Sequence, residues 1–209
     1  MSALPSPLRV FSRSSRLARL QVEEALPFLQ QAFPDRKFQA EALETVGDRD
    51  LSTPLTDPSV PADFFSRELD RLQLMGEADL VVHSAKDLPQ PLPEGLVLGA
   101  MLPARDTRDS LVIREGVDLR EGGVIGTSSS VREAAMRELY PLCTFKSIRG
   151  DIGQRLAQLD AGDYDAVIIA GCAQAPVDYG PLEAKVAQAK SGDFGSCYTN
   201  INAAAVNLE

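Results

Sequence analysis

Histidine and cysteine are scarce in this chain. Its 209 residues include one histidine and three cysteines, Cys143, Cys172 and Cys197, and no two cysteines form a C-x-x-C pair. Zinc sites of the Cys/His type need several such ligands at close spacing, so the shortage argues against one, and we expect no bound metal. The odd, unpaired cysteines favour reduced thiols in a cytoplasmic protein.

Long apolar runs and an excess of positive charge are also missing. No stretch approaches the roughly 18–20 apolar residues of a membrane span, and the first residues lack the apolar core of a signal peptide. We therefore expect a cytoplasmic protein with no membrane partner. The formal net charge of −9 argues against general nucleic-acid binding, which needs many phosphate-neutralising lysines and arginines. An acidic total still permits a local basic pocket.

The apolar pattern of the first hundred residues indicates alternating strands and helices. The hydrophobic fraction is 44%, typical of a soluble globular protein. The spacing predicts strands at 8–11, 38–45, 80–82 and 96–101, helices at about 16–31 and 64–75, and a polar loop at 47–61. A β-α-β opening favours a parallel sheet, so we expect an α/β domain over residues 1–102.

A second α/β domain is predicted over residues 103–175. The pattern places strands at 111–114, 124–125, 145–148 and 166–169, and helices at about 130–139 and 152–160. The polar segment 103–109 is a candidate hinge. Residues 176–209 contain one predicted helix, 182–190, and are interpreted as the end of the second domain with a return to the first.

Polar and cationic side chains follow four of the predicted strands. In open α/β sheets such strand ends converge on a ligand crevice, and serines at a helix start, together with arginines, suit an anion. The sequence therefore predicts a small-anion site. Its candidate residues are Arg13, Ser14 and Ser15; His83, Ser84, Lys86 and Asp87; Thr127, Ser128, Ser129 and Arg132; and Arg149 and Arg155.

Each of these groups also has a plainer interpretation. The serines after Thr127 can simply cap a helix, Arg155 can be a solvated helix charge, and His83 can be a structural histidine. Asp87 is either half of a surface pair with Lys86 or an ionised carboxylate in a cationic cleft. In the second case it could stabilise a developing cation or shuttle a proton.

Seven ordered motifs between about residues 8 and 172 resemble the porphobilinogen deaminase (hydroxymethylbilane synthase) family. The most distinctive is H-S-A-K-D-L-P at 83–89, which is similar to the family's H-S-x-K-D-x-P. The others are R-S-S-R-L-A-R-L-Q at 13–21, L-P-E-G-L at 92–96, R-D-T-R-D-S at 105–110, G-T-S-S at 126–129, I-R-G-D at 148–151 with Arg155, and L-D-A-G-D-Y-D-A-V-I-I-A at 159–170.

The resemblance implies a fold, a reaction and a cofactor. The fold is α/β, two domains of the type II periplasmic-binding-protein kind with a ligand cleft between them. The reaction is a transferase reaction in haem biosynthesis that joins four porphobilinogen units into hydroxymethylbilane and releases ammonia. The cofactor is a dipyrromethane attached to a cysteine of a third domain.

The resemblance also implies residue roles. It makes Asp87 the catalytic carboxylate and gives the cationic side chains to the acetate and propionate groups of the polyanionic substrate. The implied binding residues are Arg13, Ser15, Gln21, His83, Ser84, Lys86, Thr127, Ser128, Ser129, Arg132, Arg149, Gly150 and Arg155.

The chain departs from the family pattern at several positions. Val131 stands where the family has the first of two arginines, Val46 replaces the arginine of T-R-G-D, and Val60–Asp63 replaces a G-G-K-G segment. From the resemblance, we expect the third domain to begin where this sequence ends. Cys197 and Cys172 are the candidates for cofactor attachment, although the sequence shows no low-pKa thiol.

Three functional hypotheses follow. The first is a short porphobilinogen deaminase. The second is a non-catalytic relative that binds a tetrapyrrole or another small polycarboxylate. The third is an anion-sensing domain of the solute-binding type. The oligomeric state, a monomer or an unspecified oligomer, is left open.

Overall fold

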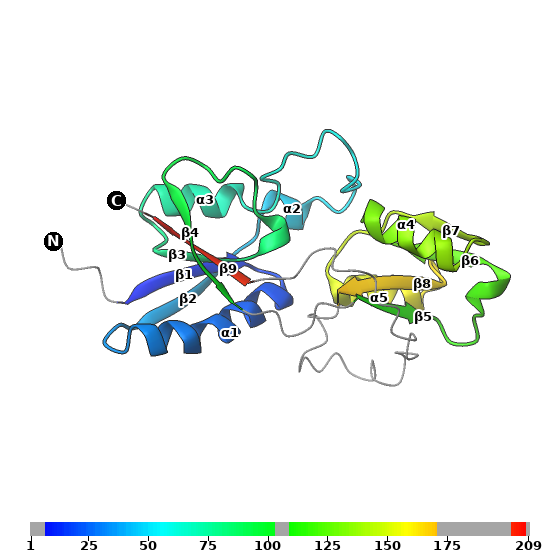
Figure 1. Cartoon of the computed structure of the whole chain (residues 1–209), viewed down its shortest axis with the longest axis horizontal. Coiled ribbons are helices and arrows are strands. Elements are labelled where there is room, and N and C mark those ends of the chain that lie inside the picture. Colours follow the sequence, from blue (N-terminus) through cyan, green and yellow to red (C-terminus); the bar gives the residue numbers. More distant parts are fainter. Residues whose placement is uncertain (1–6, 103–108, 171–201, 208–209) are drawn as a thin grey trace. The chain divides into compact units, whose positions relative to one another are not determined.

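The computed structural model describes residues 7–102, 109–170 and, as backbone, 202–207. The chain divides into two compact units (Figure 1). Unit 1 comprises Met1–Asp50, Pro61–Ala104 and Asn200–Glu209, and unit 2 comprises Leu51–Val60 and Arg105–Thr199. Cys172, Cys197, the predicted helix at 182–190 and most of the candidate hinge lie outside the described residues.

Unit 1 contains a mixed sheet with helices packed against both of its faces. Its strand order is β2-β1-β3-β9-β4, with β1 parallel to β2 and β3, and β9 antiparallel to both β3 and β4. The elements are β1 (Leu8–Arg13), α1 (Arg16–Ala32), β2 (Phe38–Leu43), α2 (Val46–Arg49), α3 (Arg67–Leu74), β3 (Leu80–Ser84), the 3-10 turn η1 (Ala85–Asp87), β4 (Leu96–Leu102) and β9 (Asn202–Asn207).

Alternation along the strands of unit 1 explains its two hydrophobic cores. Val82 of β3 packs with Val22 and Ala25 of α1 on one face. Val81, one residue earlier, packs with Leu69 of α3 on the other face. Successive strand residues point to opposite faces, so β3 is buried on both sides.

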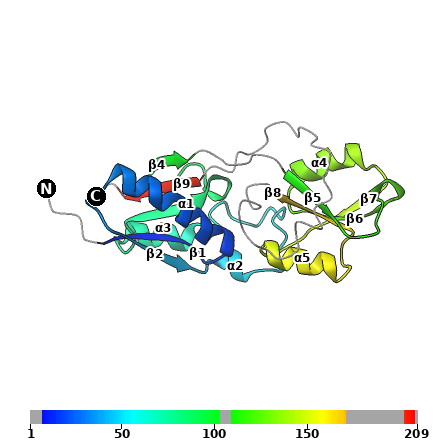
Figure 2. The ribbon, with the colours of Figure 1, turned by 90° about the horizontal axis from the view of Figure 1, so that it is seen from below.

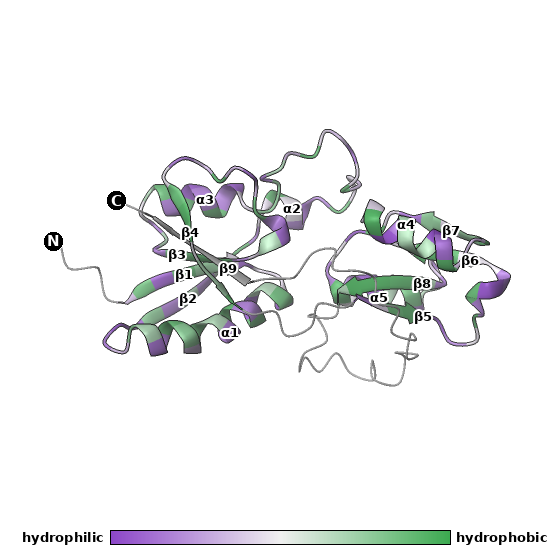
Figure 3. Cartoon of the chain, viewed as in Figure 1, coloured by the Kyte–Doolittle hydropathy of each residue, from purple (hydrophilic) through white to green (hydrophobic). Residues whose placement is uncertain are grey.

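Unit 2 has a four-stranded sheet of order β5-β8-β6-β7. Strand β6 is parallel to β7 and β8, whereas β5 is antiparallel to β8. The elements are β5 (Asp109–Ile113), the 3-10 turn η2 (Leu119–Glu121), β6 (Gly123–Gly126), α4 (Ser130–Leu139), β7 (Cys143–Lys146), α5 (Ile152–Asp160) and β8 (Ala166–Ala170). Helices α4 and α5 cover opposite faces of this sheet (Figure 2), and the central strand β8 is apolar along its whole length (Figure 3).

The α/β pattern predicted from the sequence is confirmed, with corrected boundaries. The predicted loop at 47–61 is wrong at its start, where α2 forms, because Asp48 accepts hydrogen bonds from the Thr45 backbone at 3.0 Å and from the Thr45 hydroxyl at 2.8 Å. His83 and Ser84 lie inside β3 rather than after it. Strand β7 ends at Lys146, so Arg149 lies in the connection to α5. Segment Leu51–Val60 belongs to unit 2, whereas the sequence analysis assigned it to residues 1–102.

Gly47 of α2 gives a direct test of this packing. A Cβ at Gly47 would lie 2.4 Å from Cδ1 of Phe65 and 2.8 Å from the carbonyl oxygen of Phe64. We expect Gly47→Ala to lower the free energy of unfolding by about 1–3 kcal/mol, as overpacking does. Urea unfolding followed by circular dichroism measures this.

Gly153 in α5 is the matched control. Its nearest contact for an added Cβ is Asp151 Oδ1 at 3.4 Å, an acceptable distance. Gly153→Ala should therefore be neutral or stabilising, by up to about 1 kcal/mol, because alanine favours helix. Equal losses in both variants would contradict the close approach described at Gly47.

Candidate functional site

Arg13 is the centre of a polar cluster in unit 1. It is the last residue of β1 and its guanidinium group contacts two carboxylates. Nη1 lies 3.1 Å from Asp87 Oδ2, and Nε donates to Asp48 Oδ1 at 3.0 Å. The guanidinium carbon also lies 4.2 Å from the centroid of the Phe65 ring, a cation–π geometry. Segments far apart in sequence are thus joined through one side chain.

Asp48 holds Arg13 from the side of α2. Burial alone would raise the pKa of Asp48, but the hydrogen bonds and positive charge of Arg13, together with hydrogen bonds from Thr45, outweigh it and lower the pKa below its ordinary value. Asp48 is therefore ionised at neutral pH and neutralises part of the Arg13 charge. The sequence analysis did not select Asp48, although it lies in the segment compared with T-R-G-D.

Asp87 is paired with Arg13 rather than with its neighbour Lys86. Its side chain is largely buried, with a relative exposure of 13%. Lys86 is exposed and forms no ion pair with any described residue. Of the two interpretations left open by the sequence, the surface pair is therefore wrong, and Asp87 is an inward-facing carboxylate that contacts an arginine.

His83 lies in β3, one residue before the strand ends, and is buried. Burial, followed by the positive charge of Arg13, lowers the pKa of His83 to about 4. The imidazole is therefore neutral at physiological pH, and within the described part of the chain its Nε2 has no hydrogen-bond partner. This arrangement agrees with a structural histidine better than with a general base.

Three other predicted ligand residues of unit 1 make internal hydrogen bonds. Gln21 Nε2 donates to Ser84 Oγ at 3.0 Å, and the Ser84 hydroxyl lies 3.1 Å from Gln21 Oε1. Both residues are buried. Ser15 caps α1 by accepting a hydrogen bond from the Ala18 backbone at 3.3 Å. These contacts fix α1 against β3 and so support the end of β1 that carries Arg13.

Unit 2 contains a cluster of arginines. Burial, then the positive charges of Arg132 and Arg149, lowers the pKa of Arg155 to about 10. Arg155 remains protonated at neutral pH, so three cations share one region. Arg132 makes a two-pronged ion pair with Asp109, at 2.8 and 2.7 Å. The Nε of Arg155 donates to the Gly150 carbonyl at 2.9 Å, and its two terminal nitrogens make no hydrogen bond to a described residue.

The hydroxyl groups of Thr127, Ser128 and Ser129, which precede α4, form hydrogen bonds to backbone groups of unit 2. Ser129 Oγ accepts from the Arg132 backbone at 3.4 Å and so caps the helix, and Thr127 Oγ1 accepts from the Ser129 backbone at 3.3 Å. Ser128 Oγ donates to the carbonyl oxygen of Ile148. These contacts favour the capping interpretation of this segment over direct anion binding by the hydroxyls.

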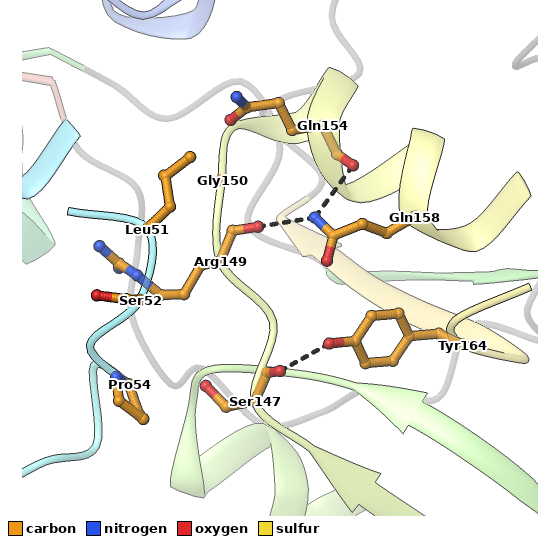
Figure 4. Close-up of a pocket in the computed structure, with 9 residues that line it drawn as sticks. All are labelled: Leu51, Ser52, Pro54, Ser147, Arg149, Gly150, Gln154, Gln158 and Tyr164. Carbon is orange, nitrogen blue, oxygen red and sulfur yellow. Dashed lines mark hydrogen bonds between the residues drawn. The ribbon is translucent and has the colours of Figure 1, made fainter. Parts of the chain in front are cut away.

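A pocket of about 430 Å³ opens beside Arg149 in unit 2 (Figure 4). One wall comes from the segment that begins at Leu51, and the other from the β7–α5 connection, α5 and Tyr164. The lining residues are Leu51, Ser52, Pro54, Ser147, Arg149, Gly150, Gln154, Gln158 and Tyr164. A pocket that combines serine and glutamine side chains with a guanidinium group suits a carboxylate-bearing ligand.

Two kinds of site are not found in the described part of the chain. No group of three or more histidine, cysteine, aspartate or glutamate side chains is placed to hold a metal ion there. None of the helices described above has the length and apolar character needed to cross a bilayer. Cys143 is buried, and burial followed by the charge of Asp165 raises the pKa of its thiol.

Comparison with known proteins identifies the family. The family model described as "Porphobilinogen deaminase, dipyromethane cofactor binding domain" matches residues 8–180. The chain belongs to the porphobilinogen deaminase family. It is 43% identical over 176 residues to the porphobilinogen deaminase of Synechococcus elongatus, covering 81% of this chain and 55% of that protein.

A second relative gives the same result. The porphobilinogen deaminase of Prochlorococcus marinus strain NATL1A is 41% identical over 169 residues, which cover 78% of this chain and 53% of the relative. The chain thus spans about half the length of the curated porphobilinogen deaminases that it matches. The family predicted from the ordered motifs is confirmed.

Solved structures of low sequence identity confirm the fold. The regulator HinK of the LysR family from Pseudomonas aeruginosa superposes with a TM-score of 0.54 at 13% identity, covering 100% of this chain and 65% of that one. The alkanesulfonate-binding protein SsuA from Xanthomonas axonopodis pv. citri gives 0.51 at 15% identity, covering 99% and 67%. The predicted α/β fold of the type II periplasmic-binding-protein kind is therefore confirmed.

His83 is the only histidine of the chain, so its titration can be followed without assignment ambiguity. We expect its NMR signals to titrate with a midpoint of about 4 in the folded protein, and near 6.5 in urea-unfolded protein. Because the folded pKa is the lower one, the unfolded chain binds the proton first, and the free energy of unfolding should fall as the pH drops from about 6.5 towards 4. A folded-state midpoint near 6.5 would show that the imidazole is solvated.

Proposed function

We propose that this chain provides the catalytic carboxylate and part of the anion-binding surface of a porphobilinogen deaminase, a transferase that joins porphobilinogen units into hydroxymethylbilane. The observation that carries the proposal is the contact between Asp87 and Arg13. The Asp87 carboxyl group is largely removed from water and is held in place by the Arg13 guanidinium group, so it is suited to stabilise positive charge that develops on a bound pyrrole.

Each addition of a porphobilinogen unit breaks one bond and forms another. The C–N bond of the porphobilinogen aminomethyl group breaks and nitrogen leaves as ammonia. A new C–C bond forms to a pyrrole carbon, which loses its proton. Positive charge develops on the substrate as nitrogen leaves, and Asp87 is the group of unit 1 suited to stabilise it or to accept the proton. The paired Asp48 keeps Arg13 in place without removing its contact with Asp87.

The arginines of unit 2 suit the carboxylates of the substrate and of a dipyrromethane. Arg155 is half-buried and its terminal nitrogens make no hydrogen bond to a described residue, so they can donate to the acetate or propionate groups of a ligand. Arg149 and Arg155 would hold a dipyrromethane in this way. When bound, that cofactor would supply the pyrrole carbon to which the first unit is joined. The candidate attachment residues Cys172 and Cys197 lie outside the described residues.

A non-catalytic relative is the alternative, and two observations favour it. Arg132 is occupied by Asp109, and Val131 replaces the arginine that the family has beside it. The number of arginines available for ligand carboxylates is therefore smaller than the family pattern provides. Such a protein would bind porphobilinogen, a tetrapyrrole or another small polycarboxylate without turnover.

A turnover assay separates these functions. Purified protein is incubated with porphobilinogen, the product is oxidised, and uroporphyrin is detected by its absorbance. We expect product above the no-enzyme control, and a loss of at least about 100-fold in Asp87→Asn, because the variant keeps the side-chain shape but lacks the charge. Calorimetric titration with porphobilinogen measures binding separately.

Asp35→Asn is the matched control, because Asp35 is exposed in a turn of unit 1 away from the cluster. It should retain the full rate. Saturable porphobilinogen binding without product would support the non-catalytic relative. Full activity of a correctly folded Asp87→Asn protein would overturn the role proposed for Asp87.

A further inference from the structure

The connection between β7 and α5 is held by an unusual set of hydrogen bonds. Four consecutive backbone carbonyls, from Ser147 to Gly150, each accept a hydrogen bond from a side chain of another segment. The donors are Tyr164 Oη to Ser147 at 2.7 Å, Ser128 Oγ to Ile148, Gln158 Nε2 to Arg149 at 3.1 Å and Arg155 Nε to Gly150 at 2.9 Å.

These donors come from three different places in unit 2. Ser128 precedes α4, Arg155 and Gln158 lie on α5, and Tyr164 precedes β8. A connecting segment normally leaves many carbonyls to water and is correspondingly mobile. Here side chains, rather than water, donate hydrogen bonds to the carbonyls, and these bonds restrain the backbone of the segment. Two residues predicted to contact the ligand, Ser128 and Arg155, contribute to this framework.

Gln158 contacts the backbone of Arg149, the cationic residue of this segment. Its Nε2 donates to the carbonyl of Arg149 at 3.1 Å and to the carbonyl of Gln154 at 3.2 Å, so both amide hydrogens are used (Figure 4). The first bond fixes the backbone from which the Arg149 side chain extends. The second ties the glutamine to its own helix, which restricts its rotamer.

We propose that Gln158 is a positioning residue for Arg149. By holding the Arg149 carbonyl, it fixes the backbone from which the Arg149 side chain extends beside the 430 Å³ pocket, where the guanidinium group can receive a ligand carboxylate. A preorganised side chain loses less conformational entropy on binding. The inference rests on the proposed function for the identity of the ligand, a polycarboxylate pyrrole, but its structural part concerns only the Ser147–Gly150 backbone.

The variant that tests the proposal is Gln158→Met, which has similar size and flexibility but no hydrogen-bond donor. It should increase amide hydrogen exchange in peptides covering 147–150 of the ligand-free full chain. It should also weaken porphobilinogen binding about three- to tenfold, the equivalent of one ordinary hydrogen bond. The effect should appear in the Kd and KM with kcat unchanged, because Gln158 acts through a binding residue.

Two further variants complete the design. Gln158→Lys restores a donor of sufficient length and should return the exchange rates of 147–150 towards wild type; exchange is the readout for this variant, since the added charge itself alters anion binding. Gln30→Met is the matched control. The Nε2 of Gln30 also donates to backbone carbonyls, of Pro34 at 3.0 Å and Arg36 at 3.1 Å, but in an exposed turn of unit 1. It should change neither readout.

The outcomes separate this inference from the proposed function. If wild-type protein binds no porphobilinogen, the proposed function fails, and the rate at which phenylglyoxal modifies Arg149, read by mass spectrometry, replaces the binding measurement. Altered exchange and altered Arg149 reactivity in Gln158→Met, both reversed in Gln158→Lys, then support positioning. Unchanged exchange in Gln158→Met overturns the inference. Faster exchange with wild-type Arg149 behaviour also overturns it, because Gln158 would then be only a structural residue.

Discussion

The charge of one arginine organises the functional end of unit 1. Arg13 brings a guanidinium group to the end of β1, where it is largely removed from water, and such a charge requires partners. Asp48 and Asp87 meet that requirement from two different segments. The same contacts join the short helix α2 to the end of β1 and hold the Asp87 side chain in place, and the charge of Arg13 adds to burial in lowering the pKa of His83. The carboxylate that we propose as catalytic therefore depends for its position on the same ion pairs that hold Arg13.

Unit 2 differs from unit 1 because it brings several positive charges, those of Arg132, Arg149 and Arg155, close together. Arg155 is half-buried beside two other arginines, and Arg132 of this group pairs with the carboxylate of Asp109. Repulsion between neighbouring cations is tolerable when hydrogen-bonded backbone holds them apart and an anionic ligand can join them. The side-chain hydrogen bonds to the Ser147–Gly150 carbonyls provide that rigidity.

Sequence patterns predicted the elements that hydrophobic burial determines. Strand β3, helix α1 and strand β8 follow from their apolar periodicity, and the ordered motifs led to the family. Helix α2 could not be predicted in this way, since its four residues depend on the hydrogen bonds of Asp48. The pairing of Arg132 with Asp109 joins residues 23 positions apart, and no local pattern distinguishes it from ligand binding. Gln158 carried no motif at all.

The position of β9 has a consequence for how the chain folds. Strand β9 lies between β3 and β4, which are neighbours in sequence but not in the sheet. The sheet of unit 1 thus joins its first hundred residues to Asn202–Asn207, whereas the described strands of the unit 2 sheet all lie within residues 109–170. Contacts between distant residues form slowly because a long loop must close first. On the ribosome, the sheet of unit 2 can assemble while unit 1 still lacks β9, so the domain that begins first is finished last.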